Sequence, residues 1–125
     1  MGITDEFYKS IIIASLLIAS TSMALAKDPD CSGTNRWPTN MAFVHLKNAG
    51  ITDNSKLDFT KTKTIRLASE KIGKDLYRQV HIVTFTEKSG KTIEVITVNN
   101  ASEEECSMSD VEVFVVSHHL GAKQK

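Results

Sequence analysis

Hydrophobic and polar positions follow a helical pattern in one early part of the chain. Between residues 36 and 50, one side of a helix would collect Met41, Ala42, His45, Leu46 and Ala49. Pro38 suits the first turn of such a helix, and Thr39 or Asn40 is a candidate N-terminal cap. Gly50 suits the position just past the last turn, where the backbone adopts a left-handed conformation. The pattern therefore predicts a short helix that ends at Gly50.

From residue 62 onward the pattern changes to the alternation that is typical of strands. Four segments are rich in β-branched and aromatic residues, namely 62–69, 76–87, 91–99 and 110–117. Turn-forming residues separate them, and Gly90 suits the left-handed position of a three-residue hairpin loop. We therefore predict an α+β fold in which one N-terminal helix packs on a four-stranded antiparallel meander. In outline this arrangement resembles cystatin-like and related small inhibitor and binding domains, a likeness of topology alone.

The two central strands predict which side chains share a face of the sheet. A turn centred on Ser89 sets Phe85 opposite Ile93 and Val83 opposite Val95. The same face carries Tyr77, His81 and Thr97. The other face carries Val80, Ile82, Ile96 and Val98. Both faces are thus partly apolar.

One helix of about 12 residues covers only part of one sheet face, at 1.5 Å of length per residue. The second face therefore needs another cover. One candidate is the loop 51–60, which carries Ile51, Leu57 and Phe59. The other is a separate protein chain, either a second copy of this one or a target, because a large apolar patch on a soluble domain usually marks a contact.

The start of the chain has the pattern of an export signal. Residues 11–19 are apolar or small without a charge, and small residues at Ala24 and Ala26 suit a signal peptidase. We predict a signal peptide over residues 1–26 and a mature domain over 27–125. The run is shorter than the roughly 20 residues of a membrane span, so no stable anchor is expected after cleavage. The single base before the run, Lys9, is untypical and would be explained by a misplaced start codon.

Two cysteines remain in the predicted mature domain, Cys31 and Cys106. An even number in an exported chain favours a disulfide, and this one would tie the N-terminus to a late loop. Cys31 lies five positions beyond the predicted cleavage site, which excludes lipid modification at a first mature cysteine. Neither Cys-x-x-Cys nor a Cys-His pair is present, so a metal or redox site is not expected. The predicted location is the periplasm or the outside of the cell.

Charge is nearly balanced overall but segregated along the chain. Without Lys9, Asp5 and Glu6, 14 basic and 13 acidic residues remain, which argues against nucleic acid or an anionic membrane as partner. Residues 56–78 hold seven bases and three acids, whereas residues 99–112 hold five acids and no base. This segregation is either a solvated surface with local compensation or a means of steering a charged partner.

No catalytic, phosphate-binding or cofactor signature is present, and we expect neither an enzyme nor a cofactor. His118 and His119 are adjacent on a predicted strand end and would point to opposite faces, which disfavours joint metal binding. His45 and His81 would be able to meet between helix and sheet. A small ligand-binding protein or enzyme that uses such a crevice is therefore an alternative function.

The leading hypothesis from the sequence is an exported protein-binding domain, in its specific form an immunity protein or inhibitor that occludes an enzyme of the bacterial envelope. The predicted binding residues flank the two cysteines: Arg36, Trp37, Glu103, Glu104 and Glu105. Trp and Arg are common binding hot spots, although Trp37 also suits a core position at the helix entry. A third possibility is an envelope assembly factor that dimerises through a sheet face.

Overall fold

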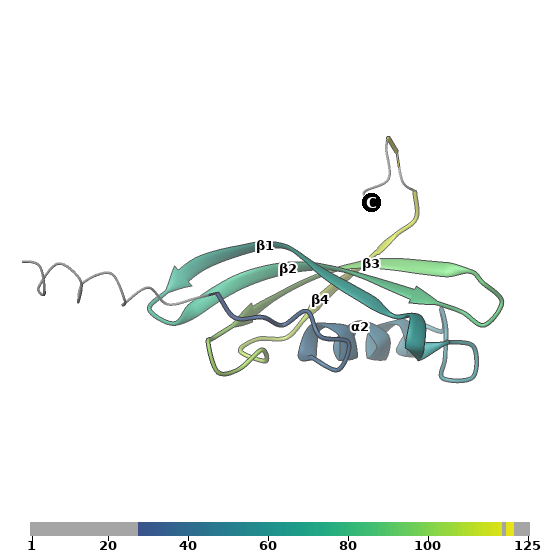
Figure 1. Cartoon of the computed structure of the whole chain (residues 1–125), viewed down its shortest axis with the longest axis horizontal. Coiled ribbons are helices and arrows are strands. Elements are labelled where there is room, and N and C mark those ends of the chain that lie inside the picture. The colour runs from purple at the N-terminus through teal and green to yellow at the C-terminus, as the bar shows by residue number, and fades with distance from the viewer. Residues whose placement is uncertain (1–27, 119, 122–125) are drawn as a thin grey trace, which may run out of the picture.

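The computed structural model describes residues 28–118 and 120–121. Its elements in chain order are α2 (Trp37–Asn48), η1 (Phe59–Lys61), β1 (Lys63–Gly73), β2 (Leu76–Thr86), β3 (Thr92–Ala101) and β4 (Glu112–Val116). The strands form one antiparallel sheet in the order β1-β2-β3-β4, and α2 lies along one of its faces (Figure 1). The predicted helix on a four-stranded meander is thus confirmed. The predicted signal peptide, residues 1–26, lies outside the described residues.

The end of α2 follows the prediction, and its beginning does not. Gly50 has a φ of 74°, its amide donates to the Lys47 carbonyl, and the Ile51 amide donates to the Leu46 carbonyl. These two bonds satisfy carbonyls that the last helical turn leaves unpaired. The position of Arg36 just before the helix makes it the N-cap, without a side-chain hydrogen bond.

The predicted caps Thr39 and Asn40 therefore lie inside the first turn. A turn precedes the helix, in which the Arg36 amide donates to the Gly33 carbonyl. The helix therefore begins at Trp37, earlier than the candidate caps Thr39 and Asn40 had indicated. Thr39 is buried, and its hydroxyl shares a 2.6 Å hydrogen bond with that of Thr64 on β1. It joins the helix to the sheet instead of capping the helix.

The central hairpin has the predicted register. Phe85 pairs with Ile93 and Val83 with Val95, and Gly90 has a φ of 95° in the connecting turn. β1 runs on to Gly73, beyond the predicted end at residue 69, because a tight turn at 74–75 lets it pair with the start of β2. Alternating side chains of β2 and β3 consequently point toward α2 or away from it.

The apolar core lies between α2 and the turn-proximal half of the central hairpin. It consists of Ala42, Leu46, Leu57, Val83, Phe85, Ile93 and Val95. Two residues of the predicted apolar side, His45 and Ala49, are exposed. The buried side of α2 is therefore narrower than its sequence pattern indicated, because the helix contacts mainly β2 and β3 and leaves the inner face of β4 partly bare.

The loop 51–60 lies on the helix side of the sheet. Leu57 is buried in the core beside Ala42 and bridges to Glu87, while Phe59 packs edge-to-face on Phe43 with ring centroids 5.1 Å apart. Of the two covers that the sequence left open for the second face, the loop 51–60 is therefore the wrong one. The turn at Gly50 sends the chain back along the face that α2 already covers, and the short connection to β1 keeps it there.

Candidate functional site

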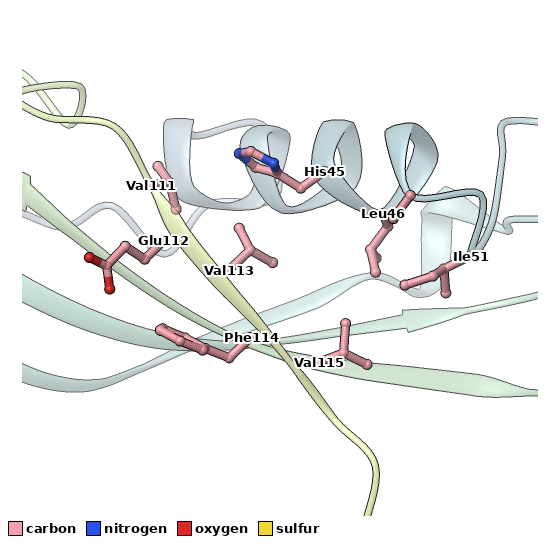
Figure 2. Close-up of a pocket in the computed structure, with 9 residues that line it drawn as sticks. His45, Leu46, Ile51, Val111, Glu112, Val113, Phe114 and Val115 are labelled. Atoms are coloured by element: carbon pink, nitrogen blue, oxygen red, sulfur yellow. The ribbon is translucent and has the colours of Figure 1, made fainter.

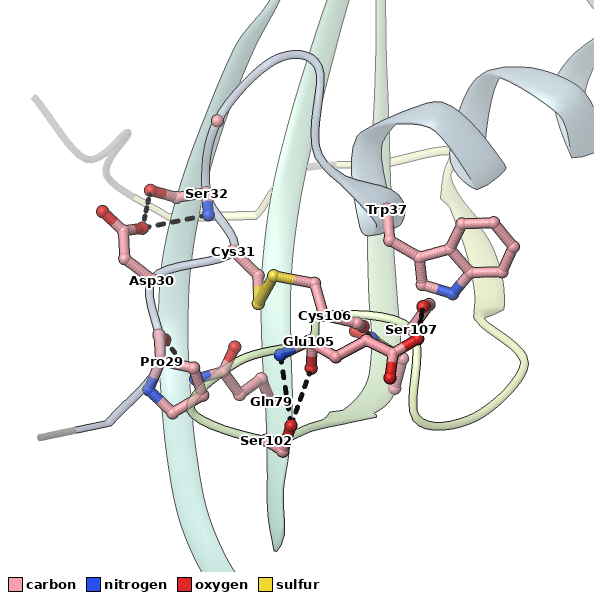
Figure 3. The surroundings of a disulfide bond; sticks show 12 residues. Pro29, Asp30, Cys31, Ser32, Trp37, Gln79, Ser102, Glu105, Cys106 and Ser107 are labelled. Carbon is pink, nitrogen blue, oxygen red and sulfur yellow. Dashed lines mark hydrogen bonds between the residues drawn. A yellow bond between two sulfur atoms is a disulfide. The ribbon is translucent and has the colours of Figure 1, made fainter. Parts of the chain in front are cut away.

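A disulfide joins Cys31 to Cys106, with the two Cα atoms 5.7 Å apart, as the sequence predicted (Figure 3). It fastens the N-terminal segment 28–32 to the loop 102–111 between β3 and β4. Both elements lie beyond the N-terminal end of α2, where the helix no longer covers the sheet (Figure 1). A disulfide is typical of an oxidising compartment outside the cytoplasm.

Beneath this disulfide, the helix side of the sheet is polar. Gln79, His81, Thr97 and Asn99 are all at most 2% exposed. The Gln79 amide donates to the Pro29 carbonyl at 2.8 Å, and Arg66 donates to the same oxygen at 3.1 Å. The Asn99 amide donates to the Cys106 carbonyl at 2.8 Å. Side chains of the sheet thus hold both segments that the disulfide connects.

His81 is sealed in this polar region. Its burial lowers the pKa of the imidazole, and the nearby positive charge of Arg66 lowers it further, against an opposing effect of Asp30. Among the described residues, neither ring nitrogen has a hydrogen-bond partner. His45, by contrast, is exposed on α2. The crevice in which both histidines would contact a ligand is not formed by the described residues.

The acidic loop, defined by Glu103, Glu104 and Glu105, is exposed and held by backbone contacts. The Ser102 amide donates to the Glu105 carbonyl at 2.8 Å, and the Glu105 amide donates to the Ser102 hydroxyl at 3.1 Å. The Glu103 amide donates to an Asp75 carboxylate oxygen at 3.0 Å, which joins the loop to the β1–β2 turn. Three carboxylates are therefore presented to solvent from a fixed backbone.

The structure brings Trp37 to the far end of the β3–β4 loop, residues 102–111, which also carries the acidic residues. Its indole nitrogen donates to the Ser109 carbonyl at 3.2 Å, and the ring projects from the start of α2 on the side of the disulfide (Figure 3). Trp37 is half-buried, so it covers the helix entry and also shows part of its ring to solvent. Arg36 is exposed next to it. The predicted binding residues thus lie at one end of the molecule, around the disulfide.

The second sheet face, here called the open face, is the other prominent surface. Its centre is an apolar row across all four strands, paired in register: Ile65, Ile82, Ile96 and Phe114. Ile65 is 58% exposed and Phe114 54% exposed. A neighbouring row adds Ala68, Val80 and Val98. Within the described residues, no helix or strand lies over this face (Figure 1).

The alternation in the two central strands was the signal for this surface. It identified Ile82 and Ile96, and the structure adds Ile65 and Phe114 from the outer strands. A hollow of about 460 Å³ at one end of the open face is lined by Arg78, Asn100, Asp110 and Glu112 among others. The hollow joins the open face to the loop that carries the acidic residues.

A groove of about 610 Å³ runs between α2 and β4 (Figure 2). The groove has an apolar lining, to which Leu46, Ile51, Val113 and Val115 contribute. His45 lies at its helix side. The groove exists because α2 packs over the central strands and leaves the inner face of β4 partly bare. Val115 is accordingly 48% exposed.

Among residues 28–118 and 120–121, no three His, Cys, Asp or Glu side chains gather closely enough to hold a metal ion. No helix in the same part of the chain is long and apolar enough to cross a membrane. Comparison of the chain with protein-family models, with curated proteins and with solved structures found no match.

Proposed function

We propose that this protein is exported to the periplasm or the outside of the cell and binds another protein there through the open face. The observation that carries the proposal is the apolar row from Ile65 to Phe114, whose two outer members are more than half exposed and whose two central members, Ile82 and Ile96, are partly exposed. Exposed apolar surface of this extent, rimmed by charged residues, is typical of protein contacts. The disulfide supports an oxidising compartment.

The specific form of the proposal is an immunity protein or inhibitor that occludes an enzyme of the bacterial envelope. The acidic loop supports it, because backbone hydrogen bonds and the adjacent Cys106 hold three carboxylates at the rim of the molecule. Fixed surface charge steers a partner of opposite charge and acts mainly on the association rate. Trp37, which is bonded to Ser109 of the same β3–β4 loop, and its neighbour Arg36 are the anchors we propose for this partner.

The test compares capture of a partner by three versions of the protein. The full-length chain is exported from its host, purified as processed, and used to capture proteins from envelope extract. The Ile82→Glu variant places a charge in the centre of the apolar row, so we expect loss of the captured partner. Val44→Glu is the matched control, because Val44 is an exposed apolar residue on α2, over the other sheet face.

A second arm concerns the acidic loop. Reversal of Glu103, Glu104 and Glu105 to lysine is expected to slow association and to flatten its dependence on salt, with a smaller effect on dissociation. Unfolding curves confirm that each variant is folded. A partner that binds Ile82→Glu and wild-type protein equally would refute the open face as the contact. Unchanged association kinetics in the acidic-loop variant would refute the steering role.

A further inference from the structure

The two edges of the sheet differ in how they prevent pairing with other strands. An edge strand offers a row of unpaired backbone groups, and proteins commonly protect it with bulges and lysines. β1 has register shifts between Arg66 and Ala68 and between Lys71 and Gly73. It also carries Lys63 and Lys71 among its exposed side chains. β1 is therefore a protected edge.

β4 has none of these features. Residues Glu112–Val116 pair with Glu94–Val98 of β3 without a register shift. The strand contains no lysine and no proline, and its single charge, Glu112, stands at its first position. Among the described residues, nothing pairs with its outer edge. β4 is therefore a regular strand that is open to pairing.

Apolar surface lies on both sides of this edge. Phe114 points toward the open face and is 54% exposed, while Val115 points into the groove beside α2 and is 48% exposed (Figure 2). A strand added to β4 would place alternate side chains beside Phe114 and in the groove. Both sets would be removed from water, so backbone pairing and apolar burial would act together.

The order of residues along β4 indicates what the added strand is. The acids Asp110 and Glu112 precede the apolar residues, and Ser117 and His118 follow them. In an antiparallel pair of two copies centred on Phe114, Val113 lies opposite Val115 of the second copy. Glu112 then lies opposite Val116 of that copy, so the two pairs of acids stay at opposite ends. A parallel pair would set Glu112 against Glu112, which costs stability.

We propose that β4 is a docking edge for a second copy of this chain. The pairing is antiparallel about a two-fold axis at Phe114, and it creates a continuous eight-stranded sheet. Such a contact is isologous, since the same surface serves both copies. It places the two open faces side by side on one surface. This inference does not rest on the proposed function, because it concerns the edge of the sheet and its own partner.

Cysteine cross-linking tests the axis. In the proposed dimer Phe114 lies next to Phe114 of the second copy, so the Phe114→Cys variant is expected to form a disulfide-linked dimer under mild oxidation. The matched control is Ile65→Cys, which has similar exposure on the same apolar row but lies on the protected edge. Equal cross-linking of both variants would indicate contact between open faces and would overturn the proposal, as would the absence of a dimer for folded Phe114→Cys.

Charges at position 116 test the register. Val116→Lys would face Glu112 of the second copy and tighten the dimer, whereas Val116→Glu would weaken it. At two cross-strand pairs per dimer, each change is expected to shift Kd by about 2- to 30-fold, in opposite directions. Sedimentation over a concentration series measures both. Glu94 lies opposite position 116 on β3 of the same chain. This pair is present in the monomer and in the dimer, so its interaction with the new charge does not contribute to the change in Kd.

A double variant completes the register test. In a Glu112→Val background, lysine and glutamate at position 116 should have nearly equal Kd values, because their charged counterpart is gone. Shifts of the same sign at position 116, or an unchanged contrast in the Glu112→Val background, would exclude the antiparallel pairing. Unfolding curves establish that each variant is folded, and partner capture through Ile82 is scored separately, so the two proposals fail independently.

Discussion

The two halves of the sheet face on the α2 side use the same strands but are stabilised by different means. Near the β2–β3 turn, Val83, Phe85 and Val95 pack on the helix as an apolar core. Toward the other end of the same strands, the inward side chains are polar and buried, His81 and Asn99 among them. There the cover is an N-terminal segment and a loop that the disulfide holds together.

This difference shows that burial in the molecule has two sources. Apolar side chains favour burial by themselves, at roughly 25 cal/mol per Å² removed from water. Buried polar side chains are costly unless they are paired, so the polar half gains little from collapse. A covalent link that restricts the unfolded chain can hold such a region closed. We infer that the disulfide does for the polar half what α2 does for the apolar half.

The largest expected effect is a cavity in the apolar half. Phe85 is 1% exposed, so Phe85→Ala should lower the free energy of unfolding by about 3–5 kcal/mol. Phe59→Ala is the control, since Phe59 is 47% exposed and should lose far less. Denaturant unfolding measures both changes. Similar losses for the two variants would show that the apolar core is not centred on Phe85.

Removal of the disulfide should act on the other half. Cys31→Ser together with Cys106→Ser is expected to lower the free energy of unfolding by roughly 2–5 kcal/mol. Hydrogen exchange should quicken most at residues 99–101, which lie beneath the disulfide, and least at residues 93–95 of the same strand. Uniform quickening along β3 would contradict a separate role for the two halves.

The pH dependence of stability should report the burial of His81. Its folded pKa lies below the unfolded value of about 6.5, so the unfolded state binds the proton more readily. The free energy of unfolding should therefore be highest above about pH 6.5 and fall as the pH is lowered through that value. His81→Leu should remove this decline, and His45→Gln should keep it.

Carboxylates belong to a separate, more acidic range. Hydrogen bonds from Ser32, Ser55 and Thr60 hold the pKa values of Asp30, Asp53 and Asp58 below their ordinary value of 3.8. Their contribution to stability is present above that value and is lost as the pH falls below it. A decline near pH 6 that persists in His81→Leu would therefore refute the assignment to His81.

The smallest expected effect is at the join between helix and loop. Trp37→Phe keeps an aromatic ring but removes the bond from the indole nitrogen to Ser109. We expect a loss of about 0.5–1.5 kcal/mol in the free energy of unfolding, with faster hydrogen exchange confined to the loop 102–111. Trp37→Ala would add the loss of ring packing. If Trp37→Phe leaves the loop unchanged, this bond does not hold the loop in place.

Local rules were sufficient for much of the fold. Alternation in the central strands set Phe85 opposite Ile93, and the chain reversals at Gly50 and Gly90 follow from their freedom to adopt positive φ. The disulfide between Cys31 and Cys106 followed from their number and the predicted export. Each of these conclusions depends on residues close in sequence or on a single possible pairing.

The candidate site was only partly predictable. The acidic loop and Trp37 were selected as residues adjacent to cysteines, and the bond between Trp37 and Ser109 spans 72 positions that no local pattern relates. The sequence did not decide whether the loop 51–60 or another protein chain covers the second sheet face. It also suggested that His45 and His81 meet between helix and sheet. The structure buries one histidine, exposes the other, and sends the loop 51–60 to the helix side.

By itself, then, the sequence determined the helix and the four strands and the register of the β2–β3 hairpin, because backbone geometry and side-chain alternation act over a few residues. It also determined the disulfide, because the predicted mature domain has only two cysteines. Only the tertiary structure decided which apolar surface stays exposed. Whether Ile65 and Phe114 are covered depends on where α2 and the loop 51–60 pack, and a helix of 12 residues can cover only the central strands of one face. The open face and the edge of β4 stay exposed because one helix can bury only a limited area.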